Sequence, residues 1–491
     1  MRDNNTAQRL ARNTALLSVA QVSRVVFNTI LSLFIARWMG VEDFGKYGVL
    51  TAYFGVFYVL AVMGAPRYVV REMARARTIA GDYDIGRQQR WFHITLLNQL
   101  IGGILAVIVM LCVAHLLNHP SDTRQALLLS SLSLIPAAIS SAMEIALQAV
   151  EKMDHIAVTH IVAGGIQLIG SLTALWLGHG LWMLAWMMVI WQVTIALMQI
   201  VITLRLGFWN RFHWYGRESL ILFRDSFEFF ILSLSAIVFS RLDVLILSQV
   251  AGEAAVGVYN AAYLVVRGIN FIAASYGQAI YPTLSHCYRQ SRAQFEKLIF
   301  KSLLWGMVGM LLVALALSIY AEQIIQLLYA QDAYSLAARV LAIEAIFVAI
   351  FFWNSVLSRG LMAGDMQSRS VVVSTIKLVI ALGYYSIFTN WWGVTGAAIA
   401  TVTAALTGTA LNYYFVNKYV YRLDIVTLLI KPLMVAVVSG GIWFLLLNLG
   451  CPFAVVVGLG VYIGLAWSLH LVSDEDIMLL KRVTIKSRRI I

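Results

Sequence analysis

The sequence predicts an all-α membrane protein that crosses the bilayer about fourteen times. Hydrophobic residues make up 60% of the 491 residues and charged residues only 12%, whereas a soluble globular chain carries roughly a quarter charged residues. Only six prolines interrupt the chain, which leaves little of it for linkers or tails. Nearly the whole chain is therefore expected to fold within lipid.

Hydrophobic stretches of spanning length follow one another along the chain, since a membrane-spanning helix needs about 20 mostly apolar residues. The apolar run of the first continues to Ala36, beyond the roughly 7 to 15 residues of a signal peptide, which predicts an uncleaved first helix. The predicted spans are residues 14–37, 47–70, 91–114, 126–149, 156–178, 181–204, 221–250, 256–281, 298–320, 335–358, 371–390, 394–417, 427–448 and 453–472.

The distribution of basic residues predicts the orientation, because Lys and Arg in short loops stay on the cytoplasmic side. With the N-terminus inside, 28 of the 36 Lys and Arg residues fall in cytoplasmic loops and tails or within four residues of a cytoplasmic span end, and only Arg37, Lys46 and Arg124 fall in outer loops. Both ends of a fourteen-span chain then lie in the cytoplasm. This orientation explains the net charge of +12, and nucleic-acid binding is not needed to account for it.

A sequence repeat divides the spans into two sets of six. The stretch "MGVEDFGKYG" after the first span returns as "AGEAAVGVYN" after the seventh, with Gly40 and Gly45 matching Gly252 and Gly257 at the same spacing. Because six is even, both halves enter the membrane from the same side, so the repeats are parallel. The predicted domains are an N-terminal six-helix lobe, a C-terminal six-helix lobe, and two additional helices with a basic cytoplasmic tail: residues 1–210, 211–420 and 421–491.

The N-terminal "ARNTALLSVAQVSRVVFNTILSLFIARWMGVEDFGKYG", the later "GEAAVGVYNAAY" and the fourteen-span plan resemble the polysaccharide transporter family. That family includes Wzx-type O-antigen flippases and belongs to the superfamily of multidrug, oligosaccharidyl-lipid and polysaccharide exporters. The resemblance implies two lobes around a central cavity and movement of an undecaprenyl-diphosphate-linked glycan to the periplasmic leaflet of the bacterial inner membrane. It also implies a polysaccharide polymerase and a chain-length regulator as partners.

Charged and polar residues within the spans indicate where such a substrate would bind, because a charge in the bilayer core is costly and usually faces a cavity or a partner. Arg24 and Arg267 lie near the midplane of the first and eighth spans, and Arg241 lies in the outer half of the seventh. Guanidinium groups bind phosphate oxygens bidentately. We therefore expect these arginines, with Asn28 and Asn270, to contact the substrate; a buried ion pair is the alternative for each arginine.

Acidic residues within the spans indicate how transport would be driven. Glu344 lies mid-span and Asp243 lies beside Arg241, and a desolvated carboxylate is able to bind a proton or Na⁺ during a cycle. A salt-bridge role is the alternative for Glu344. Glu144 lies close to a cytoplasmic helix end, which favours a place at the membrane interface, and Lys377 is expected to extend towards the cytoplasmic interface.

Other kinds of site are not indicated. The sequence contains no phosphate loop, no HExxH motif and no nucleophile elbow, so neither a cofactor nor enzymatic activity is predicted. The three cysteines have no metal-ligand spacing, and the pair His115 and His119 has no evident third ligand. Two rival functions remain: a cation-coupled drug exporter with the same fold, and a membrane-embedded glycan ligase or polymerase, for which the outer loops are short.

Overall fold

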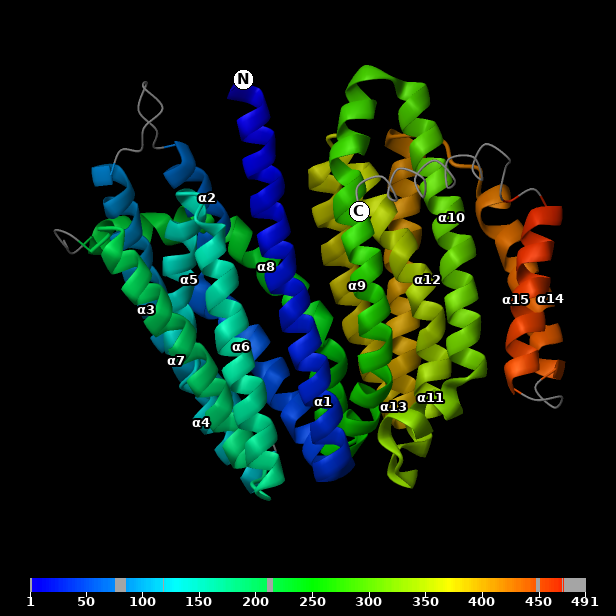
Figure 1. The fold of residues 1–491 in the computed structure, drawn as a ribbon, viewed down its shortest axis with the longest axis horizontal. Helices are drawn as coiled ribbons and strands as arrows, with labels where there is room; N and C mark the ends of the chain where they lie inside the picture. The colour runs from blue at the N-terminus through cyan, green and yellow to red at the C-terminus, as the bar shows by residue number, and fades with distance from the viewer. Residues whose placement is uncertain are drawn as a thin grey trace. The chain divides into compact units, whose positions relative to one another are not determined.

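The computed structural model describes residues 2–75, 85–117, 119–209, 215–446, 451–469 and 471, and every regular element within them is helical (Figure 1). The chain separates into two compact units, Met1–Asn260 and Ala261–Ile491. Unit 1 holds α1 (Arg2–Val62), α2 (Ala65–Arg75), α3 (Ile85–Leu116), α4 (Ser121–Ser131), α5 (Leu134–Ala149), α6 (Met153–Trp176), α7 (Leu181–Arg205), α8 (Gly216–Val250) and the start of α9 (Glu253–Gln290). Unit 2 holds the rest of α9, α10 (Arg292–Ile319), α11 (Ala321–Tyr329), η1 (Asp332–Tyr334), α12 (Ser335–Ala363), α13 (Gln367–Tyr419), η2 (Val426–Ile430), α14 (Lys431–Leu446) and α15 (Cys451–Ser468).

The predicted fold class is confirmed. Eleven helices in the described part of the chain are long and apolar enough to cross a membrane, and Ala454–Ser468 is a shorter apolar helix. Two of the eleven bend at a glycine with positive φ, Gly40 in α1 (φ 86°) and Gly393 in α13 (φ 56°). Glycine adopts this conformation without steric cost. The bent helix α13 contains two of the predicted spans, and α1 contains the first span and most of the second.

Two predicted span ends are wrong. The second span was expected to reach residue 70, but α1 ends at Val62, and Met63 and Gly64 turn the chain with positive φ into the separate helix α2. The eighth was expected to end at Pro282, but α9 continues through this proline to Gln290. A proline removes one backbone hydrogen bond, and the helix continues because neighbouring residues keep theirs.

Two glycine-rich segments of unit 1, the copies of the sequence repeat, pack against each other reciprocally. A Cβ atom placed on Gly45 would overlap the backbone carbonyl of Glu253, and one placed on Gly257 would overlap the backbone carbonyl of Val41. Val41 and Glu253 are equivalent positions of the repeat. The start of α9 therefore lies directly on α1 just after the Gly40 kink.

Apolar side chains hold the other end of unit 1 together. The short helix α2 buries Val69 and Met73 against Phe92 of α3, Met143 of α5 and Leu222 of α8. The turn before α2 also contacts α8, where Ser226 Oγ donates to the Met63 carbonyl at 3.0 Å. Helices α2, α3, α5 and α8 are therefore joined in one core at this end.

Unit 2 is built around α10, α12 and α13, with α14 and α15 packed on each other (Figure 1). A buried cluster in this unit includes Phe295, Trp353 and Tyr462, and the Trp353 indole donates to the Leu303 carbonyl at 2.9 Å. The lobes predicted from the repeat divide the chain near residue 210, whereas packing divides it after Asn260. The division into lobes stays a prediction.

Candidate functional site

The first half of α1 places Arg24 at a cavity of about 150 Å³ inside unit 1. Helices α5 and α6 supply the opposite wall, with Glu144 and Gln148 one helical turn apart on α5 and His160 on α6. The Arg24 side chain is exposed and the Glu144 carboxylate carries 22% exposure. An exposed cation and a partly buried anion therefore line the same cavity.

Glu144 is held in place by neighbours on two other helices. His160 Nε2 lies 2.7 Å from Glu144 Oε1, and Gln199 Nε2 of α7 donates to the same oxygen at 3.2 Å. Arg24 attracts the carboxylate electrostatically, although no ion pair within 4.0 Å is formed among the described contacts. These contacts fix the orientation of the Glu144 carboxylate in the cavity.

The polar cluster extends from Glu144 towards the second half of α1. Tyr58 is hydrogen-bonded to Ser141 and lies within the electrostatic influence of both Glu144 and Arg24. Ser141 Oγ also accepts from Gln99 Nε2 of α3 at 3.2 Å. Five helices therefore contribute side chains to a polar network around Arg24, which we call the Arg24 cluster: Arg24, Tyr58, Gln99, Ser141, Glu144, Gln148, His160 and Gln199.

The sequence analysis identified Arg24 but missed Glu144 and His160 as its neighbours. Glu144 was expected at the membrane interface because α5 ends at Ala149. The structure instead turns it inward, where it shares a helix face with Gln148. Glu144 and Gln148, the one charged and the one amide side chain of α5, lie four positions apart, and this spacing was the available signal.

The remaining predicted residues of unit 1 lie in different surroundings. Asn28 is partly buried on α1, one turn after Arg24. On α8, Arg241 Nε lies 3.9 Å from the position that a Cβ on Gly55 would occupy, so Arg241 rests on a glycine of α1. Asp243 is 6% exposed, accepts from its neighbour Val244 N at 2.8 Å and is hydrogen-bonded to Tyr259.

In unit 2, Arg267 is exposed on α9, whereas Asn270, three residues on, is 8% exposed. Glu344 is fully buried in α12. Lys377 is largely buried, with its aliphatic stem over Gly408 of the same bent helix α13. A chamber formed by Arg24, Arg241 and Arg267 would combine residues of both units, and it stays a prediction.

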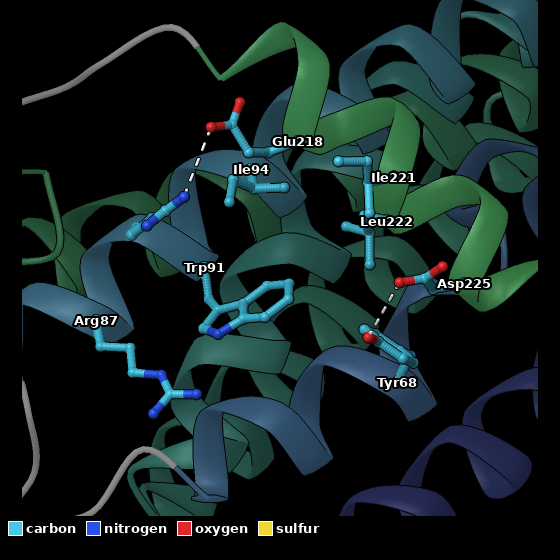
Figure 2. Close-up of a pocket in the computed structure, with 9 residues that line it drawn as sticks. Tyr68, Arg87, Trp91, Ile94, Glu218, Ile221, Leu222 and Asp225 are labelled. Atoms are coloured by element: carbon cyan, nitrogen blue, oxygen red, sulfur yellow. Dashed lines mark hydrogen bonds and ion pairs between the residues drawn. The ribbon is translucent and has the colours of Figure 1, made fainter.

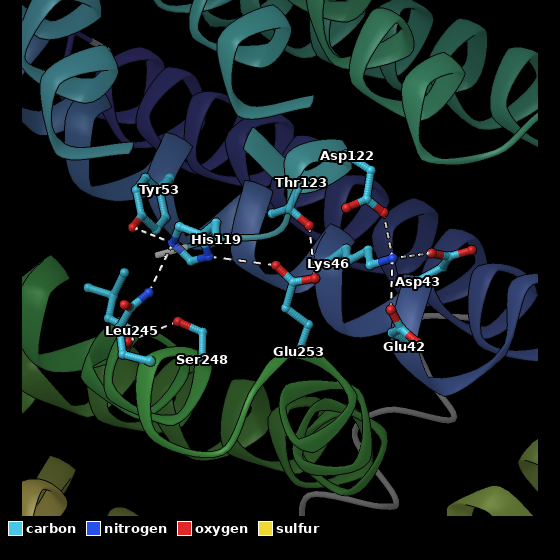
Figure 3. Close-up of polar contacts among 11 residues, drawn as sticks. Glu42, Asp43, Lys46, Tyr53, His119, Asp122, Thr123, Leu245, Ser248 and Glu253 are labelled. Carbon is cyan, nitrogen blue, oxygen red and sulfur yellow. Dashed lines mark hydrogen bonds and ion pairs between the residues drawn. The ribbon is translucent and has the colours of Figure 1, made fainter. Parts of the chain in front are cut away.

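A second polar cluster joins α1, α4, α8 and α9 within unit 1 (Figure 3). Glu253, at the start of α9, accepts from Thr123 Oγ1 at 2.8 Å and lies 3.6 Å from His119 Nδ1. The His119 Nε2 atom lies 2.8 Å from the Tyr53 hydroxyl and 3.1 Å from Gln249 Nε2. His119 thus belongs to a buried hydrogen-bond network.

Beside this cluster, Lys46 Nζ contacts Asp122 Oδ2 at 2.6 Å, Glu42 Oε1 at 2.9 Å and Asp43 Oδ1 at 3.3 Å (Figure 3). Lys46 is one of the few basic residues predicted for outer loops, and its three carboxylate partners account for its place there. Among the described residues, no group of three or more His, Cys, Asp or Glu side chains is arranged to hold a metal ion.

Comparison with known proteins extends these findings. A family model described as polysaccharide biosynthesis protein matches residues 10–288. A probable lipid II flippase MurJ of Bdellovibrio bacteriovorus is 25% identical over 189 residues, which are 37% of this chain and 36% of the relative. A probable low-salt glycan biosynthesis flippase, Agl15 of Haloferax volcanii, is 21% identical over 189 residues, which are 38% of this chain and 40% of the relative. The chain thus spans about two fifths of the length of these curated relatives.

Solved structures resemble the whole fold. The lipid II flippase MurJ in an inward closed conformation has a TM-score of 0.71 and 15% identity, covering 93% of this chain and 99% of that one. An inward-facing multidrug resistance MATE family transporter of the MOP superfamily has a TM-score of 0.66 and 16% identity, covering 82% of this chain and 98% of that one. At such low identity these likenesses establish the fold, and they leave the substrate open.

Proposed function

Because this chain belongs to the polysaccharide biosynthesis protein family, we propose that it is a flippase that moves a lipid-linked glycan across the membrane. The relatives that match parts of it are described as probable flippases of lipid II and of a glycan biosynthesis pathway. The substrate that fits best is an undecaprenyl-diphosphate-linked oligosaccharide used for O-antigen, capsule or exopolysaccharide synthesis.

The observation that carries the proposal is the guanidinium of Arg24 at a cavity inside a membrane-spanning helix bundle. A diphosphate bears two or more negative charges and does not cross hydrocarbon unaided. A guanidinium remains protonated when desolvated and offers five donors in a fixed fork. Arg24 would therefore hold the diphosphate in the bundle, with Asn28 donating one turn further along α1. The isoprenoid tail would remain in the surrounding lipid bilayer.

Glu144 would couple diphosphate binding at Arg24 to the uptake of a proton. The Glu144 carboxylate interacts electrostatically with Arg24 across the cavity. When a diphosphate binds to Arg24, two anions compete for one guanidinium, which favours uptake of a proton by Glu144. The bound anion and a proton would then be linked through one arginine.

The other predicted contacts complete the proposal. Arg241, Arg267 and Asn270 would contact the headgroup or the glycan as the substrate passes by alternating access. Glu344 and Asp243 remain candidates for a H⁺ or Na⁺ site, although the hydrogen bonds of Asp243 to Val244 and Tyr259 make it the more constrained of the two. Transport would run from the cytoplasmic to the periplasmic leaflet of a bacterial inner membrane, beside a polymerase and a chain-length regulator.

The test is flipping of an undecaprenyl-diphosphate oligosaccharide in proteoliposomes, comparing wild type with Arg24→Ala at matched protein levels. Arg205→Ala is the control, because Arg205 is an exposed arginine at the end of α7. We expect Arg24→Ala to lose at least tenfold in initial rate, Arg24→Lys to retain part of it, and the control to match wild type.

Two results would contradict the proposal. Wild-type protein that moves no lipid-linked glycan but exchanges organic cations for H⁺ or Na⁺ would be a drug exporter with the same fold. Wild-type protein that transfers a glycan to an acceptor would be a ligase or polymerase. Equal rates for wild type and a folded Arg24→Ala variant would leave the flippase intact but remove Arg24 from the substrate path.

A further inference from the structure

Unit 1 contains another cavity, of about 290 Å³, between α2, α3 and α8 (Figure 2). It lies at the end of the unit that carries the basic loops, which the orientation rule predicts to be cytoplasmic. Helix α2 at its edge is only 11 residues long, is not among the candidate spans, and separates apolar from charged residues around its circumference. Such a helix suits the membrane surface. The polar and aromatic side chains that line the cavity are Tyr68, Arg87, Arg90, Trp91, Glu218 and Asp225.

An aromatic surface forms the middle of this cavity. The Trp91 indole is partly buried and meets the Tyr68 ring edge-on, with centroids 6.2 Å apart at 67°. Ile94 and Leu222, both buried, line the cavity beside it. The indole is thus supported by the core, and it lies between two pairs of polar side chains (Figure 2).

Each polar pair combines a donor with a carboxylate at the outer limit of bonding distance. Arg90 Nη2 lies 3.5 Å from Glu218 Oε1 on one side, and the Tyr68 hydroxyl donates to Asp225 Oδ2 at 3.5 Å on the other. Burial and the Asp225 carboxylate raise the pKa of the Tyr68 phenol, so it stays protonated. Hydrogen bonds this long are weak. A ligand hydroxyl beside each pair would be able to accept from the donor and donate to the carboxylate.

The chemistry of these groups distinguishes between possible ligands. A sugar hydroxyl donates one hydrogen bond and accepts others, which matches a site where carboxylates alternate with a guanidinium and a phenol. The apolar C–H face of a sugar ring packs on an aromatic face, since such rings bury area while leaving polar edges free. A phosphate would be attracted by Arg87 and Arg90, but it would also face two carboxylates, Glu218 and Asp225, and like charges across a binding site are unfavourable.

We propose that this cavity binds one sugar ring of the lipid-linked glycan. The ring would stack on Trp91, with one hydroxyl bonded to both Arg90 and Glu218 and another bonded to both Tyr68 and Asp225. The identity of the glycan rests on the proposed function, but the sugar chemistry of the cavity does not. The cavity is separate from the Arg24 cluster, with which it shares no residue. Arg24 therefore recognises the anionic head and the Trp91 cavity recognises the saccharide.

The first measurement is calorimetric titration of the purified full-length protein with the free oligosaccharide. The probe is the oligosaccharide released by mild acid from the lipid-linked repeat unit of the strain that encodes the chain. We expect Trp91→Ala and Asp225→Asn to weaken binding at least tenfold, and Trp91→Phe, which keeps a ring, to restore part of it. Trp176→Ala is the matched control, because this tryptophan is 78% exposed at the end of α6.

A second pair of measurements separates this site from the flippase proposal. Arg24→Ala should bind the free oligosaccharide as wild type does, while Trp91→Ala should raise the KM for flipping with little change in kcat. If wild type binds oligosaccharide through Trp91 but flips nothing, the flippase proposal fails and the saccharide site stands. The saccharide site is wrong if wild type flips the substrate but neither Trp91→Phe nor Asp225→Asn changes the oligosaccharide affinity or the KM.

Competition by inorganic pyrophosphate is the remaining comparison. Pyrophosphate that displaces the oligosaccharide, or that binds wild type and gains affinity in Asp225→Asn, would show a phosphate pocket and overturn the sugar assignment. Oligosaccharide binding that is insensitive to pyrophosphate would support it. Size-exclusion profiles and circular dichroism identify any variant that fails to fold. If Trp91→Ala fails to fold, Asp225→Asn still tests the site, because Asp225 is at an exposed position on α8.

Discussion

Gly45 of α1 and Gly257 of α9 pack backbone to backbone, so that a Cβ on Gly45 would lie 2.8 Å from the Gly257 nitrogen. The two glycines occupy the same position of the sequence repeat, 212 residues apart. Each packs on the backbone carbonyl four positions before the other glycine, Glu253 for Gly45 and Val41 for Gly257. A motif that occurs twice in the chain therefore forms one contact between its copies.

Substituting either glycine should separate these helices. Gly45→Ala and Gly257→Ala each place a methyl group against backbone, which is unable to rotate away as a side chain would, and overpacking of this kind costs about 1–3 kcal/mol. We expect a lower thermal unfolding midpoint in detergent for both variants. Gly165→Ala is the control, since nothing lies within 4 Å of that position in α6, and a drop of equal size in the control would contradict the explanation.

The buried carboxylate of Glu253 should depend on its donor from α4. Thr123→Val keeps the shape of the side chain but removes the hydroxyl that donates to Glu253 Oε2 at 2.8 Å. A buried acceptor that loses its donor costs about 1–3 kcal/mol, so thermal stability should fall. The control is Thr173→Val, whose hydroxyl bonds only its own helix, at the Ile169 carbonyl, among the described contacts. Unchanged stability in Thr123→Val would mean that water replaces the threonine.

Neutralising Glu144 should change the pH dependence of transport. Glu144→Gln keeps an acceptor near His160 and Gln199 but removes the negative charge that competes for Arg24. We expect tighter binding of the anionic headgroup, seen as a lower KM, together with a flatter profile of flipping rate against pH. The comparison is Glu322→Gln, an exposed position on α11. A pH profile identical to that of wild type would exclude Glu144 from proton coupling.

Asp424, outside the candidate spans, should stabilise the start of the helical segment that leads into α14. Its carboxylate accepts from Val426 N at 3.0 Å and from Thr427 Oγ1 at 2.7 Å, and the Thr427 hydrogen bond holds its pKa below the ordinary value of 3.8. A lowered folded-state pKa stabilises the protein above the unfolded-state pKa, and the benefit is lost as pH falls through the folded value.

The measurement is the unfolding midpoint of wild type against Asp424→Asn between pH 7 and pH 3. The advantage of wild type should be constant above about pH 5 and shrink towards pH 3, following the direction of the pKa shift. Asp332→Asn serves as the control, at an exposed acidic residue between α11 and α12. An advantage that grew on acidification would contradict the assignment.

Features that depend on neighbours along the chain were predictable from the sequence. The number of spans follows from apolar runs, and the kinks at Gly40 and Gly393 fall in the glycine-containing segments between predicted spans. The end of α1 was placed too late because the residues after it remain apolar. The chain turns at Met63 and Gly64, where a Cβ on Gly64 would meet Phe230 N at 2.5 Å, and this contact with α8 has no local signature.

The sequence by itself determined that this chain is a multi-span helical membrane protein with an internal repeat. Apolar runs and glycine spacing are local patterns that are legible along the chain without knowledge of its packing. Tertiary structure alone decided which polar residues share a cavity. Glu144 meets His160 and Gln199, 16 and 55 positions away, and Tyr68 meets Asp225, 157 positions away. Such meetings depend on the rotation of each helix about its axis, and in lipid that rotation is set by packing against other helices.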